Sequence, residues 1–130
     1  MNHRILLLFS VFFLFVILST SFVNAEVRVC YDCANCSNEL VDSVYLELNN
    51  SISNDTATCI QNSLKENITI DCKGSSITGG SSDYGIYLQN CQNITIKNCS
   101  VDGYFNGIYL HDVSGRNLKY PNEIIEDIRR

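Results

Sequence analysis

The chain has 130 residues, of which 45% are hydrophobic, and its formal net charge is −5 at pH 7. This acidic balance disfavours a nucleic-acid partner, because binding to a phosphate backbone depends on a surplus of lysine and arginine. A chain of this length forms one small domain, whose core is marginal unless it is cross-linked or built by stacking.

Residues 1–25 have the pattern of an export signal. A short basic start is followed by the apolar residues 5–23, and Val23-Asn24-Ala25 offers small residues at a cleavage position. The alternative is an uncleaved membrane anchor, since residues 5–25 carry no charge and are long enough to span a bilayer as a helix. Both interpretations predict an extracytoplasmic protein, secreted or at the cell surface. Only the uncleaved anchor would keep the chain in contact with a membrane.

Residues 26–58 are expected to form a cysteine-rich cap and the first strand. Cys30, Cys33 and Cys36 have a spacing that also suits thiolate ligands of zinc or of an iron–sulfur cluster. Disulfide bonds are the favoured interpretation, because export leads to an oxidising compartment and no fourth ligand is evident nearby. The three cysteines are therefore disulfide candidates, and no metal is expected.

Every second residue from 44 to 48 is apolar, which predicts a half-buried strand, and residues 49–58 follow as a polar loop. Asn49 and Asn54 lie in this loop within Asn-x-Ser/Thr triplets and are the candidate glycosylation sites. Three further triplets begin at expected chain corners, where asparagine side chains bond to turn backbones without any glycan. These asparagines are Asn67, Asn93 and Asn98.

Cys59 and Cys72 are expected to form a disulfide bond, because they flank the loop at the start of the repeats described next. The chain has seven cysteines, an odd number, so at least one thiol stays unpaired or bonds another chain. Cys91 and Cys99 are expected to be buried simply as small residues.

Residues 59–120 contain short segments that recur. Tyr84-Gly85-Ile86-Tyr87-Leu88 returns as Asn106-Gly107-Ile108-Tyr109-Leu110, and Asn67-Ile68-Thr69-Ile70 returns as Asn93-Ile94-Thr95-Ile96. Both intervals fall within the periods of roughly 20–50 residues that are typical of solenoids. Apolar residues alternate with polar ones inside each segment, which indicates strands and not helices. The sequence therefore predicts an all-β solenoid, followed by residues 121–130 as a tail or the start of a further coil.

These segments resemble the repeats of right-handed parallel β-helix proteins of the NosD-like and pectate-lyase-like superfamily. Residues 59–80 are similar to the opening coil of exported β-helix proteins found mainly in archaea. The resemblance covers roughly residues 40–115, and it implies a short right-handed parallel β-helix of about three coils behind the cysteine-rich cap. It does not imply an activity, since such repeats occur in lyases, hydrolases, adhesins and surface-layer proteins alike.

Tyr87 and Tyr109 occupy equivalent positions of the repeat, and Gln89 and His111 form the next equivalent pair. Alternation turns all four side chains outward, and stacked strands lie about 4.8 Å apart. Aromatic rings beside an amide and an imidazole suit a sugar, which offers flat C–H faces and hydroxyl groups. These four residues are the candidate ligand-binding site. The alternative is that tyrosine is simply a good strand former.

No catalytic residue is predicted. The aspartates of the repeats fall on different turns, whereas polysaccharide lyases and glycosidases need acids clustered on one face. His111 and Asp112 are neighbours, and adjacent strand residues point to opposite faces. The NosD name suggests copper binding, but the sequence does not support it. Only one histidine lies outside the signal, and the only methionine lies within the signal. No cofactor is therefore expected.

The favoured function is an exported binding or structural module, with extracellular glycans as the preferred ligand class. One alternative is the N-terminal part of a polysaccharide lyase or glycoside hydrolase, and another is a surface-layer segment. Self-association is also expected, because an uncapped end of a solenoid exposes strand edges that recruit other chains.

Overall fold

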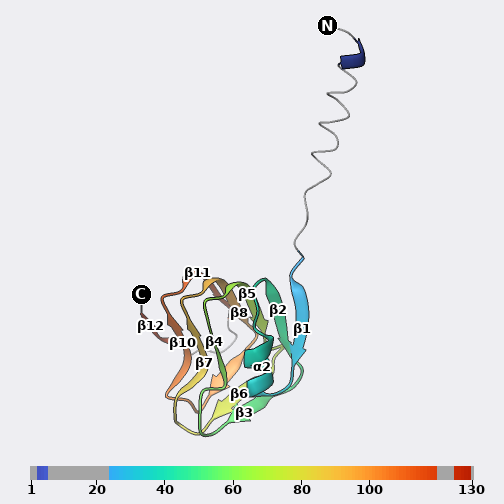
Figure 1. The fold of residues 1–130 in the computed structure, drawn as a ribbon. Coiled ribbons are helices and arrows are strands. Elements are labelled where there is room, and N and C mark those ends of the chain that lie inside the picture. Colours follow the sequence, from blue (N-terminus) through green and yellow to red (C-terminus); the bar gives the residue numbers. More distant parts are fainter. Residues whose placement is uncertain (1–2, 6–23, 120–124, 130) are drawn as a thin grey trace.

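The computed structural model describes residues 3–5, 24–119 and 125–129. The described chain is strand-rich and contains little helix (Figure 1). Most of the expected signal or anchor, residues 6–23, lies outside the described residues. In the part that is described, no helix is long and apolar enough to cross a membrane.

The described strands form three sheets, and every strand pair is parallel. The five-stranded sheet has the order β1 (Glu26–Cys30), β2 (Val44–Leu48), β5 (Glu66–Asp71), β8 (Gln92–Lys97) and β11 (Ser114–Lys119). The four-stranded sheet has the order β12 (Ile125–Arg129), β10 (Asn106–His111), β7 (Tyr84–Gln89) and β4 (Ile60–Ser63). The three-stranded sheet consists of β3 (Ile52–Asn54), β6 (Ser76–Gly79) and β9 (Ser100–Asp102).

From β2 to β10 the chain visits the five-, three- and four-stranded sheets in turn and then starts again. Each circuit adds one strand to every sheet, so equivalent residues of successive circuits lie side by side. Figure 1 shows the resulting stack, with β1 and α2 at one end and β10, β11 and β12 at the other. This winding order explains why the same short segments recur along the sequence, once in each circuit.

The core is built from rows of apolar side chains that cross the strands. In the five-stranded sheet Leu46, Ile70 and Ile96 are register partners, and all three are fully buried. The other two sheets contribute the buried rows Ile60, Ile86, Ile108 and Ile52, Ile77, Val101. Each buried aliphatic side chain stabilises the fold by roughly 1.5–3 kcal/mol. The stacking of like residues on like residues thus supplies the core that a short chain otherwise lacks.

The corners between sheets use residues that tolerate a left-handed backbone. Asn67, Asn93 and Asn98 have φ values of 57°, 52° and 54°, so the expected corner positions are confirmed. Their side-chain bonds differ from the expectation, because they go to other side chains and not to turn backbones. Asn93 Nδ2 donates to Asn67 Oδ1 at 3.1 Å, and Asn98 Nδ2 donates to Asp71 Oδ1 at 2.9 Å.

The recurring glycine of the repeat has a steric reason. A Cβ atom on Gly85 would collide with Val101 Cγ1 and would lie 2.6 Å from the carbonyl oxygen of Gly107 in the next circuit. No side chain fits where backbones of successive circuits approach so closely. This contact explains the glycine at residue 85, whereas the preceding circuit carries Cys59 next to Ile60 at the equivalent position.

The helix α2 (Cys33–Glu39) covers one end of the stack. Asp32 caps its first turn, since Asp32 Oδ1 accepts a hydrogen bond from Asn35 N at 2.7 Å. Gln61 N donates to Ser37 Oγ at 3.0 Å, and Asn62 Nδ2 donates to the carbonyl oxygens of Ser37 and Leu40. These bonds satisfy polar groups along β4 that have no neighbouring strand on that side in the described chain.

All five candidate cysteines are disulfide-bonded, but the expected Cys59–Cys72 bond is wrong. The bonds are Cys30–Cys36, Cys33–Cys59 and Cys72–Cys99, with sequence separations of 6, 26 and 27. The two longer separations match a full circuit, whereas Cys59 and Cys72 are only about half a circuit apart and lie on different sides of the stack. Cys99 is therefore not a free core residue as expected, whereas Cys91 is free and buried.

Two other elements differ from the sequence analysis. The expected polar loop 49–58 contains β3, which pairs with β6 through Ile52 and Ile77. At the other end, β12 pairs in parallel with β10, while residues 120–124 and 130 lie outside the described residues. The expected self-association at this end stays a prediction.

Candidate functional site

The outward side chains of the four-stranded sheet form two rows that cross β4, β7 and β10. One row consists of Gln61, Tyr87 and Tyr109, and the second of Ser63, Gln89 and His111. The predicted equivalence of Tyr87 with Tyr109, and of Gln89 with His111, is confirmed by this register. We call the six residues together with Tyr84 the outer strip.

Three tyrosine rings of the outer strip stack on one another. The ring centroids of Tyr87 and Tyr109 lie 5.6 Å apart with an angle of 10° between the planes. The Tyr84 ring stacks on both of them, with centroid distances of 5.2 Å to Tyr87 and 4.9 Å to Tyr109. The His111 ring lies 6.3 Å from Tyr109 and is nearly parallel to it. The rings hold one another in place, so the aromatic surface is preformed.

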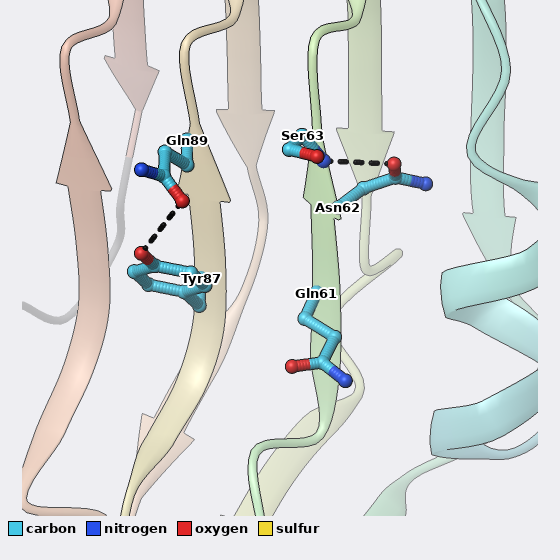
Figure 2. Close-up of a pocket in the computed structure, with 5 residues that line it drawn as sticks. All are labelled: Gln61, Asn62, Ser63, Tyr87 and Gln89. Carbon is cyan, nitrogen blue, oxygen red and sulfur yellow. Dashed lines mark hydrogen bonds between the residues drawn. The ribbon is translucent and has the colours of Figure 1, made fainter.

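A pocket of about 260 Å³ lies on the outer strip between β4 and β7. Figure 2 shows its lining, with Tyr87 and Gln89 on β7 and with Gln61, Asn62 and Ser63 on β4. Tyr87 Oη donates a hydrogen bond to Gln89 Oε1 at 3.1 Å, which fixes both side chains. The pocket thus offers one aromatic ring beside several neutral donors and acceptors.

His111 and Asp112 lie closer to each other than alternation along a strand predicts. His111 Nε2 lies 3.4 Å from Asp112 Oδ2, because Asp112 has a φ of 50° and turns the chain at the end of β10. His111 Nδ1 is buried and has no hydrogen-bond partner among the described residues. The pair is a single imidazole–carboxylate contact, and no second carboxylate within hydrogen-bond distance of His111 is found in the described chain.

Sequence reasoning missed three members of the outer strip. Gln61 and Ser63 precede Tyr87 and Gln89 by the same offset that relates Asn67 to Asn93, so that offset was the available signal. Tyr84 was missed because simple alternation places it on the opposite face from Tyr87. Gly85 and Ile86 are both buried, and this break in the alternation brings Tyr84 to the outer face.

A second polar cluster lies on the five-stranded sheet around Asp71. Asp71 Oδ2 accepts a hydrogen bond from Tyr45 Oη at 2.7 Å and lies 3.6 Å from Lys97 Nζ. Asp71 Oδ1 accepts hydrogen bonds from Asn98 Nδ2 and from Lys73 N. Burial alone would raise the pKa of Asp71, but the hydrogen bonds from Asn98, Tyr45 and Lys73 and the charge of Lys97 lower it to about 2. Every oxygen of this carboxylate is thus occupied, which makes it a structural centre and not an open site.

The fold and the outer strip together define a class of protein: a strand-rich all-β module whose parallel strands stack in register. The chain belongs to the family described as periplasmic copper-binding protein (NosD), whose model matches residues 24–129. The resemblance to the NosD-like family is thereby confirmed, and the family description is consistent with an extracytoplasmic location. None of the curated proteins and none of the solved structures that were compared matches the chain.

The donor set of this chain does not fit the copper site that the family description names. Copper sites in proteins use imidazole, thiolate and thioether ligands. From residue 24 onward the described chain offers one histidine, His111 on the outer face, and one free thiol, Cys91 in the core. No group of three or more His, Cys, Asp or Glu side chains in the described residues is arranged to hold a metal ion. We therefore assign no function through copper to this chain.

Proposed function

We propose that this chain is an extracytoplasmic right-handed parallel β-helix module that binds extracellular glycans through the outer strip. The parallel sheets visited in cyclic order support the β-helix assignment, and the family match supports the compartment. Catalysis is not part of the proposal. The described carboxylates are dispersed, since Asp71 is enclosed and Asp102 lies on a different sheet from His111.

The observation that carries the proposal is the pocket beside the tyrosine stack. A sugar presents a flat C–H face to an aromatic ring while its hydroxyl groups bond to amides. Tyr87 supplies the ring, and Gln61, Ser63 and Gln89 supply neutral polar groups around the same pocket. The alternative ligand classes fit less well, because the lining contains no charge for an ionic ligand and little apolar surface for a lipid.

The expected affinity is low. Each aromatic contact contributes about 0.5–1.5 kcal/mol beyond the burial of its area, which predicts roughly millimolar binding per chain. Useful retention then depends on several chains acting together. The test is a glycan array probed with a multimerised form of the chain, followed by titration of the hits with the single chain.

Tyr87→Ala combined with Tyr109→Ala should abolish binding and leave the fold unchanged, because both side chains lie on the outer face. Tyr31→Ala is the matched control, since Tyr31 is an exposed tyrosine on the cap, outside the outer strip. Binding should survive that change. A blank array, or binding that persists in the double variant, would show the strip to be ordinary strand surface, and the structural interpretation as a surface-layer segment would then replace the proposal.

A further inference from the structure

Six Asn-x-Ser/Thr triplets occur in the chain, and the structure distinguishes them by what each asparagine side chain does. Such triplets are the acceptors of N-linked glycans in exported proteins. The six asparagines are Asn35, Asn49, Asn54, Asn67, Asn93 and Asn98. A glycan requires a side-chain amide that is exposed and not needed by the fold.

Four of these amides take part in the fold. Asn93 and Asn67 bond to each other at a corner, and Asn98 donates to the enclosed Asp71. Asn93 and Asn98 donate through the Nδ2 atom that would carry a glycan, and Asn67 accepts through its Oδ1. All three exposed side chains are therefore held by a partner on an adjacent circuit. Asn35 Oδ1 accepts from Tyr31 N at 3.3 Å at the start of α2, and Ser37 of its triplet is bonded between α2 and β4.

Asn54, one of the two predicted sites, is also engaged. It is half-buried in β3, and its Oδ1 accepts from Thr56 N at 3.2 Å and from Thr56 Oγ1 at 3.3 Å. The amide oxygen of Asn54 and the hydroxyl of Thr56 are therefore bonded to each other, so the side chain of Asn54 is held by its own triplet.

Asn49 differs from the other five. It is exposed directly after β2, and its side chain makes no hydrogen bond in the described chain, while its backbone N–H is anchored to Cys30 O at 2.9 Å. Asn50 and Ser51 are exposed too, and Ser51 Oγ accepts one bond, from Ser76 N. The triplet is thus fixed at the surface by its backbone and leaves the Asn49 amide free.

We propose that Asn49 is the N-glycosylation site of this chain. The Asn49 Nδ2 atom attacks the anomeric carbon of a glycan carried on a lipid phosphate or diphosphate. A carbon–nitrogen bond forms as the carbon–oxygen bond to phosphate breaks. The lipid phosphate leaves with the electron pair, and the amide proton passes to a base of the transferase. This modification is independent of ligand binding at the outer strip.

The test uses the full chain, exported from a host that carries an oligosaccharyltransferase, and glycopeptide mass spectrometry of the disulfide-bonded product. We expect a glycan on the peptide that contains Asn49. Asn49→Gln and Ser51→Ala should each remove it, whereas Asn54→Gln should leave occupancy unchanged. Because Asn49 is exposed, Asn49→Gln should melt at the same temperature as the unglycosylated parent chain.

A second measurement asks whether the fold makes the selection. The purified folded chain and a reduced, unfolded sample are each incubated with the transferase and a lipid-linked glycan donor. The folded chain should gain one glycan, at Asn49, and the unfolded chain should gain glycans at further triplets. Modification of any of the other five asparagines in the folded chain, or an unmodified Asn49 in both experiments, would overturn the proposal.

Discussion

Asp71 shows how a single outward residue becomes part of the interior. Alternation places it on the outer face of β5, yet it is only 3% exposed, because Tyr45, Asn98 and Lys97 cover it from neighbouring strands. An ionised carboxylate in such a place costs free energy unless its oxygens are bonded and its charge is balanced. Here the hydrogen bonds outweigh the burial, which is why its pKa falls to about 2.

This pKa makes stability depend on pH. The folded pKa lies below the ordinary value of 3.8, so the contribution of Asp71 is complete above about pH 4 and is lost as the pH falls toward 2. The shift corresponds to about 2 kcal/mol. Asp71→Asn should therefore lower the free energy of unfolding by about that amount at pH 7, and the difference from the parent chain should vanish near pH 2.

Urea unfolding at pH 7, 5, 3 and 2 measures this difference, with the disulfide bonds kept intact. Asp55→Asn serves as the control, because Asp55 is an exposed carboxylate on the polar segment after β3. Equal stability of Asp71→Asn and the parent chain at pH 7 would show that the hydrogen bonds around Asp71 do not stabilise its charge.

Only part of the outer strip could be predicted, because only some of its residues follow the repeat and simple alternation. Tyr87 and Tyr109 stand in a repeated segment, so their equivalence follows from the sequence. Tyr84 reaches the same stack only because Gly85 lets the backbone pack against the next circuit. Gln61 belongs to a circuit that lacks the Gly-Ile-Tyr-Leu pattern. Only the interval between Asn67 and Asn93, which equals the interval between Gln61 and Tyr87, indicates that these two residues are equivalent.

At the level of elements, strands with two or more buried apolar residues in alternation were predictable, and strands with a single buried residue, such as β1 and β3, were not. Strands β2, β7 and β10 carry two or three buried apolar residues in alternation, which is a clear signal. Strand β3 has one buried residue, Ile52, and becomes a strand through pairing with β6. Helix α2 has only seven residues and little apolar periodicity, so its N-cap and its disulfide bonds carry its stability.

On loop length, Cys72–Cys99 and Cys33–Cys59 should each contribute more than Cys30–Cys36, because their sequence separations are 27, 26 and 6. The Cys72–Cys99 separation of 27 corresponds to roughly 3–4 kcal/mol if the bond acts by restricting the unfolded chain. Replacing both residues by alanine should lower the free energy of unfolding by about that amount in a urea titration. Removing Cys30–Cys36, with a separation of 6, should cost only about 2 kcal/mol. A larger loss for the shorter loop would contradict this ranking.

On the scale of the whole molecule, the cross-links are distributed unevenly. Cys33–Cys59 joins the cap to the first circuit, and Cys72–Cys99 joins the next two circuits. None of the disulfide bonds in the described residues involves β10 or β11, so within this part of the chain these strands are held by contacts with their neighbours. In a stack of this kind stability is nearly a sum of neighbouring interfaces, and the less constrained end opens first.

Hydrogen exchange should reveal this gradient. Amides of β10 should exchange faster than the equivalent amides of β7, although both strands have the same pairing register. In the variant with both Cys72 and Cys99 changed to alanine, fast exchange should extend into β7 and β8. Uniform protection of β7 and β10 in the parent chain would mean that the stack opens only as one unit.

The segment from residue 84 to residue 105 is one complete circuit, because it holds β7, β8 and β9, one strand of each sheet. Inserting a second copy of this segment would add a strand to each of the three sheets and leave the cap unchanged. The copy would also carry second versions of Tyr84 and Tyr87, two rings of the tyrosine stack. Each duplication of this segment would therefore lengthen the outer strip by one strand spacing, about 4.8 Å, with the turns of the existing circuits unchanged.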